Sequence, residues 1–189
     1  CKGANWIPCD AMVNHQTPEK YEHLLESVVA ANMNMLRVWG GGNYEKDIFY
    51  ELCDQKGILV FQDMMFSCAM YPTDEKFLNN VKNEIDYQAK RLKSYACLVL
   101  WCGDNECLNY ALSWFGGSDE KNKFNKANWL KLNDVRKKAY INADGTRAYW
   151  PSSPGNGIET YDEWDDYTRG DTHNWDVRSE EHTSELQSR

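Results

Sequence analysis

The chain has 189 residues, 42% of them hydrophobic, so it is long and apolar enough for one globular domain with a core. Its net charge is −8 and its lysines and arginines are scattered, which argues against a nucleic-acid partner, since binding would need a basic surface. No apolar run reaches the roughly 18 residues of a membrane-spanning helix, so no membrane segment is expected.

The chain does not begin with methionine, and its first residues lack the basic start and apolar stretch of a signal peptide. We therefore expect an internal fragment whose localisation stays unknown, with cytoplasm and periplasm both open. The seven cysteines include no Cys-x-x-Cys pair and no histidine at ligand spacing, so no metal site is expected. Several lie in apolar stretches, which leans towards a reducing compartment.

Short apolar segments alternate with amphipathic helices along the chain. One helix is predicted from Thr17 and Pro18, a capping hydroxyl followed by a proline suited to the first turn. The next helix ends at Gly57, a third opens at Thr73, and a fourth covers Lys126 to Ile141. The apolar stripe of the first helix comprises Tyr21, Leu24, Leu25, Val28 and Val29. The predicted strands are 2–7, 35–39, 58–61, 97–101 and 148–150.

Strands buried on both faces that alternate with helices predict a parallel sheet covered by helices, in the α/β class. Periodicity alone leaves two architectures open, a doubly wound sheet and a (β/α)8 TIM barrel. After each strand, however, the sequence turns to Trp, Gly, Asp, Asn and Glu. Functional groups at successive strand ends are typical of a barrel's active face. We therefore predict an incomplete barrel with about the first five or six strands.

The strongest chemical signal lies in the segment from Trp101 to Glu106. Glu106 follows a buried strand and has Asp104 two residues away, and both effects raise the pKa of a carboxyl group. A carboxyl group protonated near neutral pH suits general acid catalysis, whereas the alternative is a solvated acid at a strand end. Asn105 suits a sugar hydroxyl, because an amide both donates and accepts hydrogen bonds.

Strict alternation along a strand would place Asn105 and Glu106 on opposite faces, so a bulge or twist is needed if both line one pocket. Other site types fit less well. Gly40, Gly41 and Gly42 follow a strand, but the dinucleotide pattern G-x-G-x-x-G fails because Glu45 takes the third glycine position. The sequence also lacks a phosphate-binding loop motif and a Gly-x-Ser-x-Gly elbow, and no cofactor is expected.

Five stretches resemble β-mannosidases of glycoside hydrolase family 2, and the Asn105-Glu106 pair is similar to the acid/base motif of retaining (β/α)8 glycosidases. The similarity extends over residues 1–177. The stretches are Lys2-Gly-Ala-Asn-Trp-Ile-Pro8, Ala30-Ala-Asn-Met-Asn-Met-Leu-Arg-Val-Trp-Gly-Gly-Gly42, Tyr44-Glu45, Tyr149-Trp-Pro-Ser-Ser-Pro154 and Gly170-Asp-Thr-His-Asn-Trp-Asp-Val177.

The resemblance implies roles for particular residues. Glu106 would be the catalytic acid/base, and Asn105 would bind the 2-hydroxyl of the sugar. Trp39 and Trp114 would form aromatic walls around the sugar. The resemblance further implies polar groups near the pocket: Arg37 and Asp63 at strand ends, which would orient carboxylates or hydroxyls, and His173, which would line the pocket or serve as a hydrogen-bonded structural histidine.

Two features depart from the family pattern. Asp104 stands where many relatives have Asn, which would affect the pKa of Glu106. The family's nucleophile is a later Glu at a strand end, and no residue of this chain matches it. Residues 178–189 have no aromatic side chain or apolar period and resemble a translated sequencing adapter. We therefore expect a partial catalytic barrel over residues 1–177 and an artefactual tail.

The resemblance implies hydrolysis of terminal β-D-mannose residues from β-mannosides by a retaining double displacement. The expected partner is an oligosaccharide or β-mannoside, and flanking β-sandwich domains are expected in the full-length protein. The fragment alone is expected to be inactive, since it lacks the nucleophile. Alternatives are an exo-β-D-glucosaminidase, a β-galactosidase-like glycosidase, or a carbohydrate-binding barrel fragment without catalysis.

Overall fold

A computed structural model describes residues 1–113, 119–159, 161, 166 and 168–174. In this part of the chain, five strands form one parallel sheet in the order β1-β2-β3-β4-β5. The strands are β1 Gly3–Trp6, β2 Met35–Val38, β3 Leu59–Asp63, β4 Leu98–Cys102 and β5 Ala148–Trp150. All five predicted strands are confirmed, with ends that differ by one or two residues.

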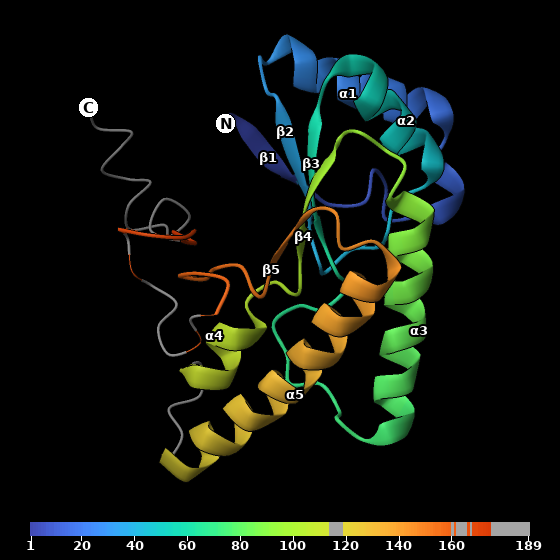
Figure 1. The fold of residues 1–189 in the computed structure, drawn as a ribbon. Helices are drawn as coiled ribbons and strands as arrows, with labels where there is room; N and C mark the ends of the chain where they lie inside the picture. Colours follow the sequence, from blue (N-terminus) through green and yellow to red (C-terminus); the bar gives the residue numbers. More distant parts are fainter. Residues whose placement is uncertain (114–118, 160, 162–165, 167, 175–189) are drawn as a thin grey trace, which may run out of the picture.

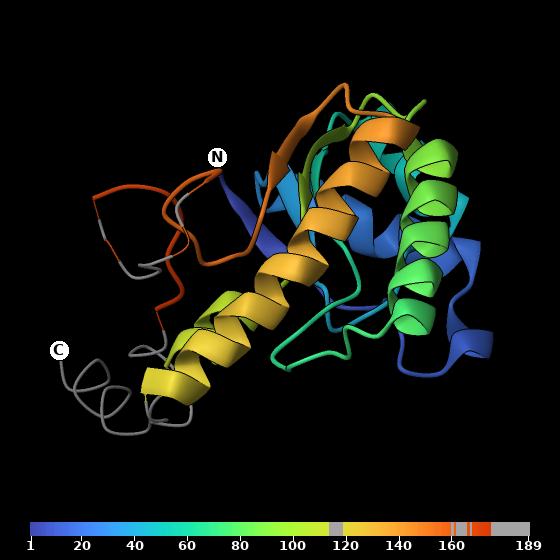
Figure 2. The same cartoon turned by 60° about the horizontal axis from the view of Figure 1, so that its bottom comes forward.

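The strand order distinguishes the two architectures that periodicity leaves open. A doubly wound sheet reverses its strand order and carries helices on both faces. Here every strand pairs with the next strand along the chain, and the long helices lie on one side of the sheet (Figures 1 and 2). Since parallel crossovers share one hand, this arrangement is that of a barrel segment. The predicted α/β class and incomplete barrel are confirmed.

Local sequence signals explain where the helices begin and end. The Thr17 hydroxyl accepts a hydrogen bond from the Lys20 amide, and the Asp74 carboxylate accepts one from the Phe77 amide. Gly57, with a φ of 68°, ends a helix in the left-handed conformation that glycine adopts without strain. The helices are α1 Pro18–Ala30, α2 Asp47–Lys56, α3 Glu75–Leu92, α4 Cys107–Leu112 and α5 Asp119–Ala143, with a 3₁₀ turn at Val13–His15.

Three details of the helices differ from the sequence prediction. Helix α5 starts seven residues before Lys126, because its first turns are polar and lack the apolar period on which the prediction relied. The short α4 was not predicted, since it is too brief to show a period. Val29, assigned to the apolar stripe of α1, is 46% exposed. Among the described residues, no helix is both long and apolar enough to cross a membrane.

The core lies between the sheet and its helices. Leu36 and Val38 on β2 and Val60 on β3 face the helices and are fully buried. Alternate residues on the other face, such as Met35 and Arg37, are only half-buried. The sequence analysis predicted strands that are buried on both faces. The second face of the sheet is instead accessible, because the five described strands do not close into a ring.

Candidate active site

The loops that follow β3, β4 and β5 are hydrogen-bonded to one another where these strands end. Asn105 forms parallel bridges to Ser67 on one side and to Ser153 on the other. The Asn105 amide donates to the Phe66 carbonyl at 2.9 Å, and the Glu106 amide donates to the Ser153 carbonyl at 2.8 Å. The sheet pairing therefore continues past the named strands and holds the backbone of Asn105 and Glu106 in place.

Glu106 adopts a left-handed backbone conformation, with φ 61° and ψ 11°. Such a conformation is uncommon for a residue with a side chain and persists where its surroundings impose it. The sequence analysis required a bulge or twist here if Asn105 and Glu106 were to line one pocket. The left-handed conformation of Glu106 provides that twist. The Glu106 side chain is buried, at 3% exposure. Its Oε1 lies 2.6 Å from Nδ1 of His173, and its Oε2 accepts a hydrogen bond from the Cys68 thiol at 3.2 Å.

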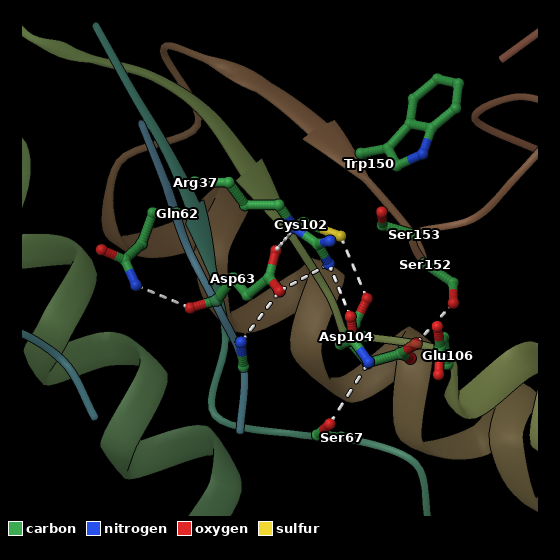
Figure 3. Close-up of polar contacts among 12 residues, drawn as sticks. Arg37, Gln62, Asp63, Ser67, Cys102, Asp104, Glu106, Trp150, Ser152 and Ser153 are labelled. Carbon is green, nitrogen blue, oxygen red and sulfur yellow. Dashed lines mark hydrogen bonds and ion pairs between the residues drawn. The ribbon is translucent and has the colours of Figure 1, made fainter. Parts of the chain in front are cut away.

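Arg37 on β2 and Asp63 on β3 form a two-point ion pair (Figure 3). Arg37 Nε donates to Asp63 Oδ1 at 3.1 Å, and Nη2 donates to Oδ2 at 2.8 Å. The same Nη2 donates to Oδ1 of Asn105 at 3.1 Å. Burial lowers the pKa of Arg37, but the surrounding acidic groups, Asp63 first among them, together raise that pKa above its ordinary value. The guanidinium therefore stays charged and fixes which end of the Asn105 amide is the acceptor.

His173 connects this ion pair to Glu106. Its Nε2 lies 3.3 Å from Nη1 of Arg37 and 2.9 Å from the hydroxyl of Ser153. Its Nδ1 faces Oε1 of Glu106 at 2.6 Å, so the imidazole contacts Glu106 through one ring nitrogen and Ser153 and Arg37 through the other. The structure thus places His173 against the predicted acid/base.

Asp104 points to the helix side of the sheet. Its Oδ2 accepts hydrogen bonds from Arg136 at 2.7 Å and from the Trp129 indole at 2.8 Å. Its Oδ1 accepts from the Cys107 amide at 3.0 Å and from the Ser152 hydroxyl. Since Arg136 compensates its charge, Asp104 is a poor source of the pKa effect on Glu106 that the sequence suggested. Asp104 instead attaches the loop between β4 and α4 to α5. The pKa of Glu106 stays a prediction.

Gly103 stands where the ends of β4 and β5 come closest. Its amide donates to the Trp150 carbonyl at 2.7 Å. A Cβ atom at this position would lie 2.4 Å from the Pro151 carbonyl oxygen and 2.5 Å from the Tyr149 hydroxyl. Glycine is therefore required for the two loops to meet.

Four residues at this edge were given no role from sequence: Ser67, Cys68, Ser153 and Asp171. The Ser153 hydroxyl and the Trp150 indole both donate to the carboxylate of Asp171, which attaches the segment carrying His173 to the loop after β5. Ser153 and Asp171 stand inside stretches that resemble the family, which was an available signal. Cys68 follows β3 by five residues and has no local signature.

The two predicted aromatic walls have different outcomes. Trp39 directly follows β2, and its ring lies over Gly41, where an added Cβ would come within 2.0 Å of the ring. Its contact with a sugar stays a prediction. Trp114 lies outside the described residues, as do residues 178–189. Within the part of the chain that the structure describes, no three His, Cys, Asp or Glu side chains are grouped to hold a metal ion.

Comparison with known proteins identifies relatives over nearly the whole chain, although no family model matches it. The β-mannosidase of Capra hircus is 43% identical over 190 residues, covering 95% of this chain and 21% of that protein. β-Mannosidase B of Aspergillus clavatus is 38% identical over 94% of this chain and 21% of its own length. The β-D-mannosidase structure from Dictyoglomus thermophilum has 45% identity and a TM-score of 0.82, covering 93% of this chain and 21% of that chain.

More distant solved structures show the fold alone. They include a β-glucuronidase of Bacteroides uniformis, with a TM-score of 0.68 at 15% identity over 78% of this chain and 17% of that chain. The exo-chitosanase CsxA of Amycolatopsis orientalis has a TM-score of 0.60 at 16% identity, over 80% of this chain and 16% of its own. The chain spans about a fifth of the length of the relatives it matches.

The sequential parallel sheet and these matches show that the chain is similar to one barrel segment of larger enzymes. More narrowly, the chain is similar to one segment of β-mannosidases, at 43% identity to the goat protein and 45% identity to the Dictyoglomus protein. The chain leaves about four-fifths of the relatives' length uncovered, which is consistent with further domains in the full-length protein.

Proposed function

We propose that the full-length protein hydrolyses terminal β-mannosides with retention of configuration, and that Glu106 is its acid/base. The observation that carries the proposal is the position of Glu106. The residue is buried at the end of β4 in an imposed left-handed conformation, and both of its carboxylate oxygens are hydrogen-bonded. A solvated strand-end acid, the alternative from sequence, would be exposed and free to rotate.

The reaction runs in two displacements. In the first, a nucleophilic carboxylate attacks the anomeric carbon while Glu106 gives its proton to the departing glycosidic oxygen, so that a covalent glycosyl-enzyme forms and the alcohol leaves. In the second, a water molecule attacks the anomeric carbon, gives its proton to Glu106 and displaces the carboxylate. The proposal places the nucleophile in the part of the enzyme outside this segment, about 5 Å from Glu106, as a retaining mechanism requires.

Asn105 is proposed to bind the 2-hydroxyl of the sugar. Its Oδ1 accepts from Arg37, and its Nδ2 faces the Ser67 hydroxyl and the Cys68 sulfur, each at 3.3 Å. The amide is therefore held in one orientation before substrate arrives, which lowers the entropic cost of binding. A hydrogen bond to the 2-hydroxyl that strengthens in the transition state contributes to catalysis.

The substrate class rests on the relatives named β-mannosidase, because the glucuronidase and exo-chitosanase neighbours share the fold alone. Arg37, Asp63 and His173 are proposed to hold Asn105 and Glu106 in place through the contacts described above. Trp39 and Trp114 are proposed as aromatic walls of the sugar subsite, since an aromatic ring packs well against the apolar face of a sugar.

The test is Glu106→Gln in the complete enzyme, assayed with aryl β-mannosides that have good and poor leaving groups. Loss of the general acid is expected to reduce turnover roughly 100- to 10,000-fold for poor leaving groups and far less for good ones. Azide, a nucleophile that needs no base, should restore turnover on the good leaving groups. Glu159→Gln is the matched control, since the Glu159 side chain is 81% exposed. Unchanged turnover on poor leaving groups would refute the role of Glu106.

A further inference from the structure

Cys68 lies in direct contact with Glu106 and is held there by its own backbone. It adopts a left-handed conformation with a φ of 47°. Its amide donates to the Asn105 carbonyl at 2.9 Å. The preceding residue, Ser67, is braced by Tyr71, whose hydroxyl accepts from the Ser67 amide at 2.8 Å. A residue kept in a sparsely populated conformation by several independent contacts is typical of functional sites.

The contacts of the sulfur atom determine where its proton points. The Ser67 hydroxyl donates to the sulfur at 3.4 Å, and Nδ2 of Asn105 donates to it at 3.3 Å. The third neighbour is Oε2 of Glu106, which accepts from the thiol at 3.2 Å. Since the first two groups donate, the single thiol proton is directed to Glu106.

The thiol keeps that proton at neutral pH. Burial raises the pKa of Cys68, the hydrogen bond from Ser67 opposes that rise, and the neighbouring Glu106 carboxyl raises the pKa further. A thiol is a weak donor, so it restrains the carboxyl group without binding it as strongly as a hydroxyl would.

We propose that Cys68 is a positioning residue for the acid/base, clamping Oε2 of Glu106 while its sulfur holds the amide of Asn105. The inference rests on the proposed function, since it assigns Cys68 a part in the proton transfers of Glu106. From the loop after β3, Cys68 thus restrains both members of the Asn105-Glu106 pair, while His173 contacts the other carboxylate oxygen, Oε1.

The test compares Cys68→Ala and Cys68→Ser in the complete enzyme by the pH dependence of kcat/KM on a poor leaving group. A hydrogen bond to a carboxylate favours its charged form, so removing the thiol raises the pKa of Glu106. Because the general acid must be protonated, the alkaline limb of the profile should move up by about half a pH unit in Cys68→Ala. Turnover should fall roughly 10-fold on poor leaving groups, with KM changed about 2-fold or less.

Cys68→Ser should return the limb to or below its wild-type position and restore turnover, since a hydroxyl donates to the same oxygen. Cys9→Ala is the control, a half-buried cysteine in the loop after β1. An alkaline limb that stays in place in Cys68→Ala, or a serine variant that behaves like the alanine variant, overturns the inference. Glu106→Gln separates the two hypotheses: if it abolishes turnover while Cys68→Ala leaves the limb unmoved, only the role of Cys68 fails.

Discussion

The carboxylate of Asp104 and the guanidinium of Arg136 form a 2.7 Å ion pair in which both side chains are completely buried. The pair joins the loop before Glu106 to α5, 32 residues further along the chain. Burial lowers the pKa of Arg136, but the neighbouring acidic groups, Asp104 first among them, together raise that pKa, so the cation persists. Nε and Nη1 of Arg136 have no hydrogen-bond partner among the described residues. The guanidinium lies instead over the rings of Phe66 and Trp129, at 5.0 and 5.9 Å.

Asp104→Ala is therefore expected to destabilise the barrel strongly. The substitution leaves Arg136 as an uncompensated buried charge, which costs about 3–5 kcal/mol. Asp104→Asn should cost less, because its amide oxygen can still accept from Cys107 or Ser152. Calorimetry of the complete enzyme checks this through the melting temperature of the barrel. Asp134→Asn is the control, since its ion pair with Lys138 is exposed and should contribute almost nothing. Equal melting temperatures for all three variants would contradict the anchoring role.

Gly103→Ala is expected to separate the ends of β4 and β5. Its Cβ would overlap the Pro151 carbonyl oxygen, which cannot retreat without breaking the backbone pairing beside Glu106. Overpacking of this kind costs about 1–3 kcal/mol, and turnover should fall with it. Gly57→Ala is the matched control: it is strained by a φ of 68° but has nothing within 4 Å, so it should lower stability and leave turnover intact. Circular dichroism melts and kcat measurements distinguish the two effects; normal kcat in Gly103→Ala would contradict the prediction.

Arg37→Lys is expected to reduce kcat/KM although the charge is kept. A lysine cannot reproduce the fork that binds both oxygens of Asp63 and the amide oxygen of Asn105. A double-mutant cycle with Asn105→Ala should give a coupling free energy of about 0.5–3 kcal/mol, as for residues in one hydrogen-bond network. Steady-state kinetics of the two single variants and the double variant provide the measurement. Strictly additive losses would show that Arg37 does not act through Asn105.

Asn105→Ala is expected to act through one substrate hydroxyl. Loss of a hydrogen bond that strengthens in the transition state should lower kcat/KM roughly 100-fold, or about 2.7 kcal/mol. On a 2-deoxy substrate the same variant should match the wild type within a few-fold, because the hydroxyl it would bind is missing. Comparing kcat/KM for both substrates with both enzymes tests this. The same large loss on the 2-deoxy substrate would assign Asn105 a different role.

Much of the fold follows from short-range patterns in the sequence. Thr17 and Asp74 start helices because their side-chain oxygens bind amides three residues ahead, and Gly57 ends one because glycine tolerates a positive φ. The apolar runs that became β2 and β4 were recognisable by composition. The helical turns before Lys126 were missed, because those residues are polar and gain their order only as part of the full helix.

The position of Glu106 just beyond a buried strand was readable from the sequence, and so was its pairing with Asn105. The neighbours that determine how Glu106 is held were not. Cys68 is 38 residues away from it and His173 is 67 residues away, and both meet it only because β3, β4 and β5 are neighbours in the sheet. Likewise, only the structure showed that Asp104 faces Arg136.

The sequence by itself therefore determined the elements, the parallel α/β class and the strand end that carries the carboxyl group, because caps, periods and strand ends are local properties of the chain. The tertiary structure decided the sequential strand order, the left-handed twist at Glu106 and the partners on both of its oxygens. These depend on backbone pairing and burial between segments far apart in the chain, whose energies no local pattern encodes.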